Sequence, residues 1–209
     1  MAHLLYIESS PRKQRSASIE VAQAFLETYR AAHSSDTIDT LDVWHTPLPE
    51  FDGETLDAKY AGIAGVPLSP TQEQAWLTIR GLAARIQRAD KLVISVPMWN
   101  YTIPYKLKHF IDCVTQKDLL FTFDENGLNG LLTHRKAAII YARGVEYNAA
   151  GLAPEIWDLQ RQYLELWLRA IGITDVATIL IEKTLFGPDM DSAARDAAKM
   201  KAHAVAMTF

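Results

Sequence analysis

The chain has 209 residues and a net charge of −4, which disfavours a nucleic-acid partner because such proteins usually carry a basic surface. Hydrophobic residues make up 49% of the chain, as in globular proteins, and we expect one domain over residues 1–209. The single cysteine excludes an intrachain disulfide. The start MAHLLYIESS lacks the basic region of a signal peptide, and no apolar run reaches the ~18 residues of a membrane span. We therefore expect a cytoplasmic protein that does not bind membranes.

Short apolar runs alternate with longer helical patterns along the chain. We expect strands at 3–7, 37–43, 91–98, 136–142 and 175–182, and helices at 18–33, 70–89, 104–116, 154–172 and 189–207. Ser69, Pro70 and Gln72 predict a capping box at the start of the second helix. Residues 44–68, rich in Pro and Gly, are expected to form a long excursion. Residues 119–132 are expected to form a β-hairpin, which the pairs Asn126-Gly127 and Asn129-Gly130 indicate.

The alternation of strands and helices predicts an α/β fold with a doubly wound, five-stranded parallel sheet in the order 2-1-3-4-5. In this order, the chain leaves strands 1 and 3 in opposite directions. Ligands of such sheets bind in the crevice beyond the carboxyl ends of these strands. The loops after the first and third strands are therefore the candidate ligand-binding loops.

The loop after the first strand is rich in hydroxyls and cations, namely Ser9, Ser10, Arg12, Lys13, Arg15, Ser16 and Ser18. A helix N-terminus with such donors favours a phosphate group. Alternatively, Ser16 or Ser18 only caps the helix and the cations are solvated. The chain has neither a G-x-x-x-x-G-K-[ST] motif nor a G-x-G-x-x-G motif after this strand, which argues against a P-loop and a dinucleotide site. A terminal monophosphate is the remaining expectation.

The loop after the third strand carries Met98, Trp99, Asn100 and Tyr101. Apolar and aromatic faces with a few amide groups suit a flat heteroaromatic ring. Alternatively, Trp99 and Tyr101 cap the core beside the sheet. A monophosphate site next to an aromatic, amide-bearing loop points to FMN.

The segment PMWNYTIP, followed by LKHFID, resembles the motif P-M-[YW]-N-[FY]-x-[IV]-P of the FMN-dependent NADH azoreductases and NAD(P)H:quinone oxidoreductases. The resemblance covers nearly the whole chain and includes SSPR, SAS, LSPTQ, FTFDENG, ARG, AIGITDV and FGPDM. It implies a flavodoxin-like fold with a β-hairpin excursion. It also implies a homodimeric enzyme that transfers electrons from NADH or NADPH through FMN to quinones and azo compounds.

The resemblance also implies which residues contact FMN. The phosphate and ribityl end would be held by Ser10, Ser16, Ala17 and Ser18. The isoalloxazine ring would contact Met98, Trp99, Asn100 and Tyr101. Its pyrimidine side would be reached by Ala142, Arg143, Gly144 and Val145. Val145 departs from the family, which commonly has a second glycine there, so the backbone path at this point is open. Tyr147 either stabilises charge on the reduced flavin or lies on the surface.

Two phenylalanines are implied at the substrate pocket. Phe121 and Phe123 alternate with Thr122 and face one side of the hairpin. They either pack on their own domain or, as the resemblance implies, the hairpin joins a dimer interface and places Phe121 at the partner's flavin. Phe186 would line the same pocket. Because one apolar pocket over the flavin holds one flat molecule at a time, we expect a ping-pong two-electron mechanism.

No protein side chain is expected to act as a catalyst, because the flavin carries the chemistry. We expect Cys113 to be a buried, inert thiol, and the six histidines show no metal-ligand spacing, so no metal is expected. Three other functions are considered: a flavodoxin-type electron carrier, a narrower FMN reductase and a flavin-free binding module. The excursion and the hairpin argue against a carrier, which needs an exposed flavin edge.

Overall fold

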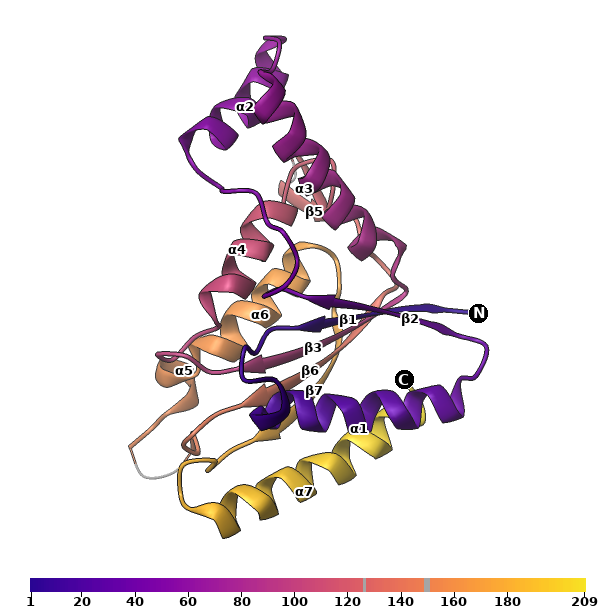
Figure 1. The fold of residues 1–209 in the computed structure, drawn as a ribbon, viewed down its shortest axis with the longest axis vertical. Helices are drawn as coiled ribbons and strands as arrows, with labels where there is room; N and C mark the ends of the chain where they lie inside the picture. The colour runs from indigo at the N-terminus through magenta and orange to yellow at the C-terminus, as the bar shows by residue number, and fades with distance from the viewer. Residues whose placement is uncertain (126, 149–150) are drawn as a thin grey trace.

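A five-stranded parallel sheet forms the centre of the molecule in a computed structural model that describes residues 1–125, 127–148 and 151–209 (Figure 1). The strand order is β2-β1-β3-β6-β7, which confirms the predicted order 2-1-3-4-5. The strands are β1 (His3–Glu8), β2 (Thr37–Asp42), β3 (Lys91–Pro97), β6 (Lys136–Ala142) and β7 (Asp175–Ile181). The predicted strands agree with these bounds to within one residue at either end.

The three central strands are buried on both faces, whereas the two edge strands are partly exposed. β3 reads KLVISVP and β6 reads KAAIIYA, and all their residues between the first and the last are buried. Such continuous apolar runs are typical of parallel strands covered by helices on both sides. The continuous apolar runs predicted these strands correctly because helices shield both of their faces from water.

Helices cover the two faces of the sheet (Figure 1). α1 (Ala17–Ala32) and α7 (Pro188–Ala206) cover one face, and α3 (Pro70–Arg88), α4 (Tyr105–Val114) and α6 (Leu159–Ala170) cover the other. Each face has its own core: Phe25, Tyr29 and Phe209 lie in one, and Phe110 and Trp167 lie in the other. None of the helices that the structure describes combines the length and the apolar character needed to cross a bilayer.

The excursion over residues 44–68 contains a helix that the sequence prediction did not include, α2 (Gly53–Ala64). The carboxylate of Asp52 accepts a hydrogen bond from the N–H of Thr55 at 3.0 Å, and Gly65 ends the helix with a left-handed φ of 68°. α2 and the first turns of α3 project together beyond the sheet (Figure 1). The predicted capping box of α3 is confirmed, since the side chains of Ser69 and Gln72 each bond the other residue's backbone N–H.

The prediction of one continuous helix over 154–172 is wrong. The chain forms α5 (Pro154–Trp157), breaks at Asp158 and continues as α6. Asp158 has φ −91° and ψ 60°, and its side chain accepts a hydrogen bond from the N–H of Arg161 at 3.0 Å. The carboxylate therefore caps a new helix instead of continuing the first one.

The predicted hairpin is confirmed as β4 (Phe121–Asp124) paired antiparallel with β5 (Gly127–Gly130). Asn126, which the sequence prediction placed at the turn, lies outside the described residues. A Cβ atom on Gly130 would overlap the backbone of Ile171 and Gly172. The hairpin thus lies directly against the end of α6, near the amino-terminal ends of β6 and β7.

Candidate active site

The candidate site is the crevice beyond the carboxyl ends of the strands, where three loops lie side by side. The hydroxyl and N–H of Ser9, after β1, both donate to the carbonyl oxygen of Ser95 in β3, at 2.6 and 3.2 Å. The N–H of Met98, after β3, donates to the carbonyl oxygen of Ala142 at 2.7 Å. These bonds fix the loops after β1, β3 and β6 relative to one another.

The loop after β1 presents buried hydroxyls at the start of α1. Ser10, Ser16 and Ser18 are each at most 4% exposed. The hydroxyl of Ser16 accepts a long hydrogen bond of 3.5 Å from the N–H of Ile19 and lies 3.2 Å from the hydroxyl of Ser18. Ser16 is therefore the helix cap, as one of the two alternatives predicted. The N–H groups of Ala17 and Ser18, in the first turn, have no acceptor within the helix and are suited to an anion.

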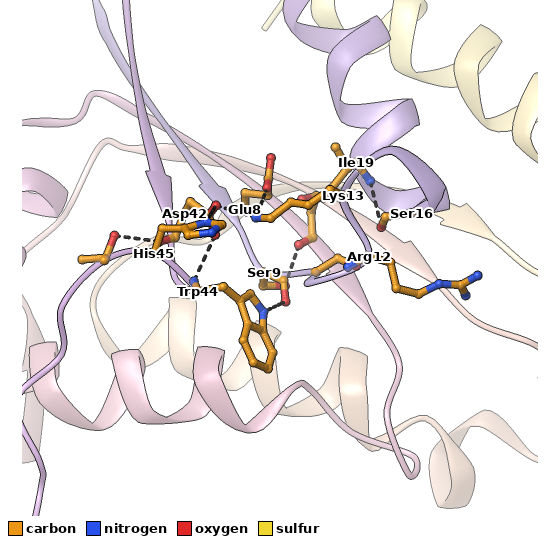
Figure 2. A network of polar contacts seen from close by, with 12 residues as sticks. Glu8, Ser9, Arg12, Lys13, Ser16, Ile19, Asp42, Trp44 and His45 are labelled. Carbon is orange, nitrogen blue, oxygen red and sulfur yellow. Dashed lines mark hydrogen bonds and ion pairs between the residues drawn. The ribbon is translucent and has the colours of Figure 1, made fainter.

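Lys13 does not add free positive charge to this loop, contrary to expectation. It has a left-handed φ of 49°, and its ammonium group donates to Glu8 at 2.6 Å and forms a second ion pair with Asp42 (Figure 2). Although partial burial opposes it, these two hydrogen-bonded carboxylates raise the pKa of Lys13. Lys13 thus ties the loop to β1 and β2, while Arg12 and Arg15 remain exposed.

The loop after β3 is a tight turn. The N–H groups of Trp99 and Thr102 donate to each other's carbonyl oxygens at 2.9 and 3.0 Å. Asn100 and Tyr101, between them, have φ values of 45° and 72°, as in a type I′ turn. Two consecutive left-handed residues other than glycine are strained, and such strain is found mostly at functional sites. The backbone N–H groups of both residues lack an acceptor in the part of the chain that the structure describes.

Aromatic rings flank this turn on both sides. Tyr101 is 51% exposed, so it does not cap the core, and its ring lies 5.5 Å from that of Trp157. Trp99 packs against Trp44, with ring centroids 5.9 Å apart. The indole N–H of Trp44 donates to the carbonyl oxygen of Ser9 at 2.9 Å, which connects the loops after β1, β2 and β3 (Figure 2). Sequence reasoning missed Trp44, although a tryptophan two residues after a strand was a usable signal.

The loop after β6 holds a buried cation and a buried phenol. Arg143 is 3% exposed and Tyr147 is 6% exposed, so the alternative of a surface tyrosine is wrong. The Tyr147 hydroxyl donates to the sulfur of Met98 at 3.1 Å, and burial raises the pKa of this phenol. Val145 is not among the described residues with a left-handed φ. Its backbone therefore does not need the freedom of the glycine that the family commonly has there.

The two phenylalanines lie in different places. The loop after β7 runs along the loop after β6, because the N–H of Leu185 donates to the carbonyl oxygen of Gly144 at 3.2 Å. Phe186, 56% exposed, follows directly in this loop, which leaves the carboxyl end of β7. Phe121 is in the hairpin, which lies near the amino-terminal ends of the strands, whereas the crevice of the same chain lies at their carboxyl ends.

Cys113 is buried, as predicted, and burial raises the pKa of its thiol to about 12. At this pKa the thiol stays protonated at neutral pH, which makes it a poor nucleophile. In the described ranges, no three His, Cys, Asp or Glu side chains are arranged to hold a metal ion. A groove of about 740 Å³ lies away from the crevice, between α3 and residues 47–55. Its lining includes Glu50, Asp52 and Glu54, which disfavour a phosphate.

The fold and this crevice define a class of protein: the chain belongs to the family with a flavodoxin-like fold, whose sequence model matches residues 2–205. It is 51% identical to "FMN-dependent NADH:quinone oxidoreductase 9" of Burkholderia lata, over 100% of both chains. It is 46% identical to "FMN-dependent NADH:quinone oxidoreductase 3" of Pseudomonas fluorescens, over 99% of this chain and 96% of that protein. The crystal structure of an azoreductase from Bacillus anthracis superposes with a TM-score of 0.92, at 27% identity and with 100% of both chains covered.

Proposed function

We propose that this chain is an FMN-dependent oxidoreductase that transfers electrons from NADH or NADPH to quinones and azo compounds. The observation that carries the proposal is the junction of two loops at the carboxyl ends of β1 and β3. Anion-binding donors at the start of α1 lie beside a strained aromatic turn with free N–H groups. Relatives that are similar over the full length are named FMN-dependent NADH:quinone oxidoreductases, which supports an enzyme over an electron carrier or a flavin-free module.

The start of α1 fits the phosphate and ribityl end of FMN. Ser10, Ser16 and Ser18 supply hydroxyl donors, and Ala17 and Ser18 supply N–H groups at the positive end of the helix dipole. The loop has no glycine-rich turn for a pyrophosphate, so a monophosphate is the matching ligand.

The loops after β3 and β6 fit the isoalloxazine ring. Met98, Trp99, Asn100 and Tyr101 would border the ring with apolar surface and the free N–H groups of the turn. Ala142, Arg143, Gly144 and Val145 would face its pyrimidine side. Since the side chain of Arg143 is buried and its own N–H and carbonyl oxygen are already hydrogen-bonded, the backbone of Gly144 and Val145 would make this contact. The phenol of Tyr147, whose only acceptor in the described residues is a weakly accepting thioether, is the proposed donor to the reduced ring.

Bound FMN supplies the two-electron chemistry between NADH and the acceptor. The chain itself binds and orients the flavin and excludes water with Trp99 and Phe186, and no side chain is required as a nucleophile. We further propose ping-pong order, because a pocket over one flavin face holds one flat molecule at a time.

Several wider features belong to the same proposal. The chain acts as one domain and as a homodimer, in which the hairpin brings Phe121 to the partner's flavin. The exposed Phe123 and Leu128, 58% and 55% accessible on the hairpin, support such an interface. A cytoplasmic location is consistent with a nicotinamide donor and with a single, buried cysteine.

Spectroscopy and turnover of the purified protein test the proposal. The protein is expected to be yellow, to release FMN and not FAD on denaturation, and to oxidise NADH faster when a quinone is added. A protein that stays colourless after reconstitution with FMN would overturn the flavin site. A flavin-loaded protein that does not turn over NADH with quinone would instead be a carrier.

A further inference from the structure

Arg143 carries a buried positive charge that the proposed function does not use directly. Its Nη1 donates to Oδ2 of Asp158 at 2.8 Å, and its Nε lies 3.7 Å from Oε1 of Glu182, which is an ion-pair distance but too long for a hydrogen bond. Nε and Nη2 are buried without a hydrogen-bond acceptor among the described residues. A buried cation is costly to maintain, so its retention calls for a role.

The guanidinium is closed off from any ligand in the crevice. The side chains of Arg143 and Asp158 are only 1% and 6% exposed. The backbone of Arg143 is also occupied, since its N–H donates to Ile181 and its carbonyl oxygen accepts from the hydroxyl of Thr184 at 3.1 Å. Arg143 therefore acts through the residues that it holds in place.

The ion pair links two sets of contacts between the loops after β3 and β6. On one side, the Arg143 guanidinium lies 5.1 Å from the centre of the Tyr147 ring, and the Tyr147 hydroxyl bonds Met98 at the end of β3. On the other side, Asp158 follows Trp157, whose ring packs on Tyr101 in the turn after β3. The loop after β6 is thus connected twice to the loop after β3, and the Arg143–Asp158 bond joins the two connections.

Both carboxylate oxygens of Asp158 accept a hydrogen bond in this arrangement. Its Oδ1 accepts from the N–H of Arg161 and caps α6, while its Oδ2 accepts from Arg143. The break between α5 and α6, which places Trp157 beside Tyr101, therefore depends on the same carboxylate as the ion pair.

We infer that Arg143 and Asp158 are positioning residues whose ion pair holds the loops after β3 and β6 at the spacing that FMN requires. The inference rests on the proposed flavin site and adds which residues fix the distance between the two loops that would border the flavin. The pair thereby sets the affinity for FMN and its reduction potential, without contact to the flavin.

The test compares R143M, D158N and the double variant R143M/D158N. R143M leaves the buried Asp158 carboxylate without its ion pair, and D158N leaves the buried Arg143 cation with only Glu182 at 3.7 Å, so both single changes are expected to be destabilising. The double change removes both buried charges of the pair, and Glu182, whose side chain is 22% exposed, is left partly solvated. Asn retains the cap of α6, because it is as good an N-cap as Asp. D39N is the matched control, since it disrupts the bidentate Arg85–Asp39 pair away from the crevice. The readouts are thermal unfolding of the apo-protein, FMN affinity by titration and the reduction potential of bound FMN.

The double variant is expected to recover the apo-protein stability that the single variants lose. Its FMN affinity is expected to stay about ten-fold or more below the parent's, with a shifted reduction potential, while D39N binds FMN like the parent. If the double variant regains parental affinity and potential together with stability, the pair is only structural and the inference fails. A parent chain that does not bind FMN would overturn the proposed function itself, which is a separate outcome.

Discussion

At the start of α1, the hydroxyl of Ser16 combines two roles at one atom. It caps the helix through a weak 3.5 Å bond to the N–H of Ile19, and it lies 3.2 Å from the hydroxyl of Ser18. A hydroxyl can donate one hydrogen bond while it accepts others, so the cap and a phosphate contact are compatible. Capping is thus no argument against a phosphate site here.

Replacement of Ser16 or Ser18 by alanine is expected to weaken FMN binding about ten-fold or more for each substitution. A hydrogen bond to a charged group contributes about 1.5–3 kcal/mol. Titration of the apo-protein with FMN measures the effect. Ser69→Ala is the matched control, because it removes an N-cap from α3, away from the crevice. If S16A and S69A lose stability alike and both retain parental FMN affinity, Ser16 is only a cap.

Asp36 predicts a pH-dependent contribution to stability. Its carboxylate accepts hydrogen bonds from the Tyr29 hydroxyl and the N–H of Ala2, both at 2.6 Å, and lies 3.5 Å from the Lys91 ammonium. These contacts, the Tyr29 bond first, lower the pKa of Asp36 to about 2. Because the folded-state pKa is lowered, the stabilisation is complete above the unfolded pKa of about 3.9 and is lost as pH falls towards 2.

The variant D36N is therefore expected to unfold at a lower temperature than the parent at pH 7, with a difference that shrinks as the pH is lowered to about 2. Thermal unfolding of both proteins across this range measures the difference. A gap between the two that stays constant from pH 7 to pH 2 would contradict the role of the Asp36 charge.

At the scale of elements, two glycines decide how the hairpin meets the helical layer. Gly130 in β5 lies against Gly172 after α6, and Gly172 has a left-handed φ of 103°. The N–H of Leu132 then donates to the carbonyl oxygen of Ile171 at 2.9 Å. This approach of two backbones positions the whole hairpin, and it leaves no room for a side chain on Gly130.

Gly130→Ala is expected to destabilise the protein by about 1–3 kcal/mol, because the new methyl group must displace backbone. Gly81→Ala is the control: it lies within α3, nothing surrounds its Cβ position within 4 Å, and it should stabilise the helix by about 0.5–1 kcal/mol. Chemical unfolding of both variants gives these free energies. Equal stability of G130A and the parent would show that the hairpin does not depend on this contact.

At the scale of the whole molecule, the hairpin lies near the amino-terminal ends of the strands, opposite to its own crevice, and we propose that Phe121 acts at the flavin of a second copy of the chain. The turnover of NADH with quinone is therefore expected to fall on dilution, in parallel with dissociation of a dimer. Sedimentation and activity over one dilution series measure both. F121A should lower turnover with quinone. A fully active monomer would contradict the shared site.

The proposed single pocket over the flavin predicts ping-pong kinetics. Oxidised nicotinamide must leave before the quinone enters, so double-reciprocal plots at several quinone concentrations are expected to be parallel. C113S should retain turnover, because the buried thiol takes no part. Plots that intersect would indicate a ternary complex and a second substrate position.

The sequence by itself determined the sheet, its order and the loops that form the candidate site. Central strands such as KLVISVP are apolar throughout, and the caps of α3 are local bonds between neighbouring residues, so local patterns were sufficient. The same holds for the hydroxyls before α1 and for the aromatic turn, because both directly follow predicted strands.

Only the tertiary structure decided how side chains from separate segments combine. Lys13 is neutralised by carboxylates at the ends of two strands, and Trp44 bonds the backbone of Ser9. The apparent single helix over 154–172 breaks at Asp158, which caps α6 and pairs with Arg143 from the loop after β6. Helical periodicity records which face of a segment is apolar, but it does not record a charge fifteen residues away whose burial requires a partner.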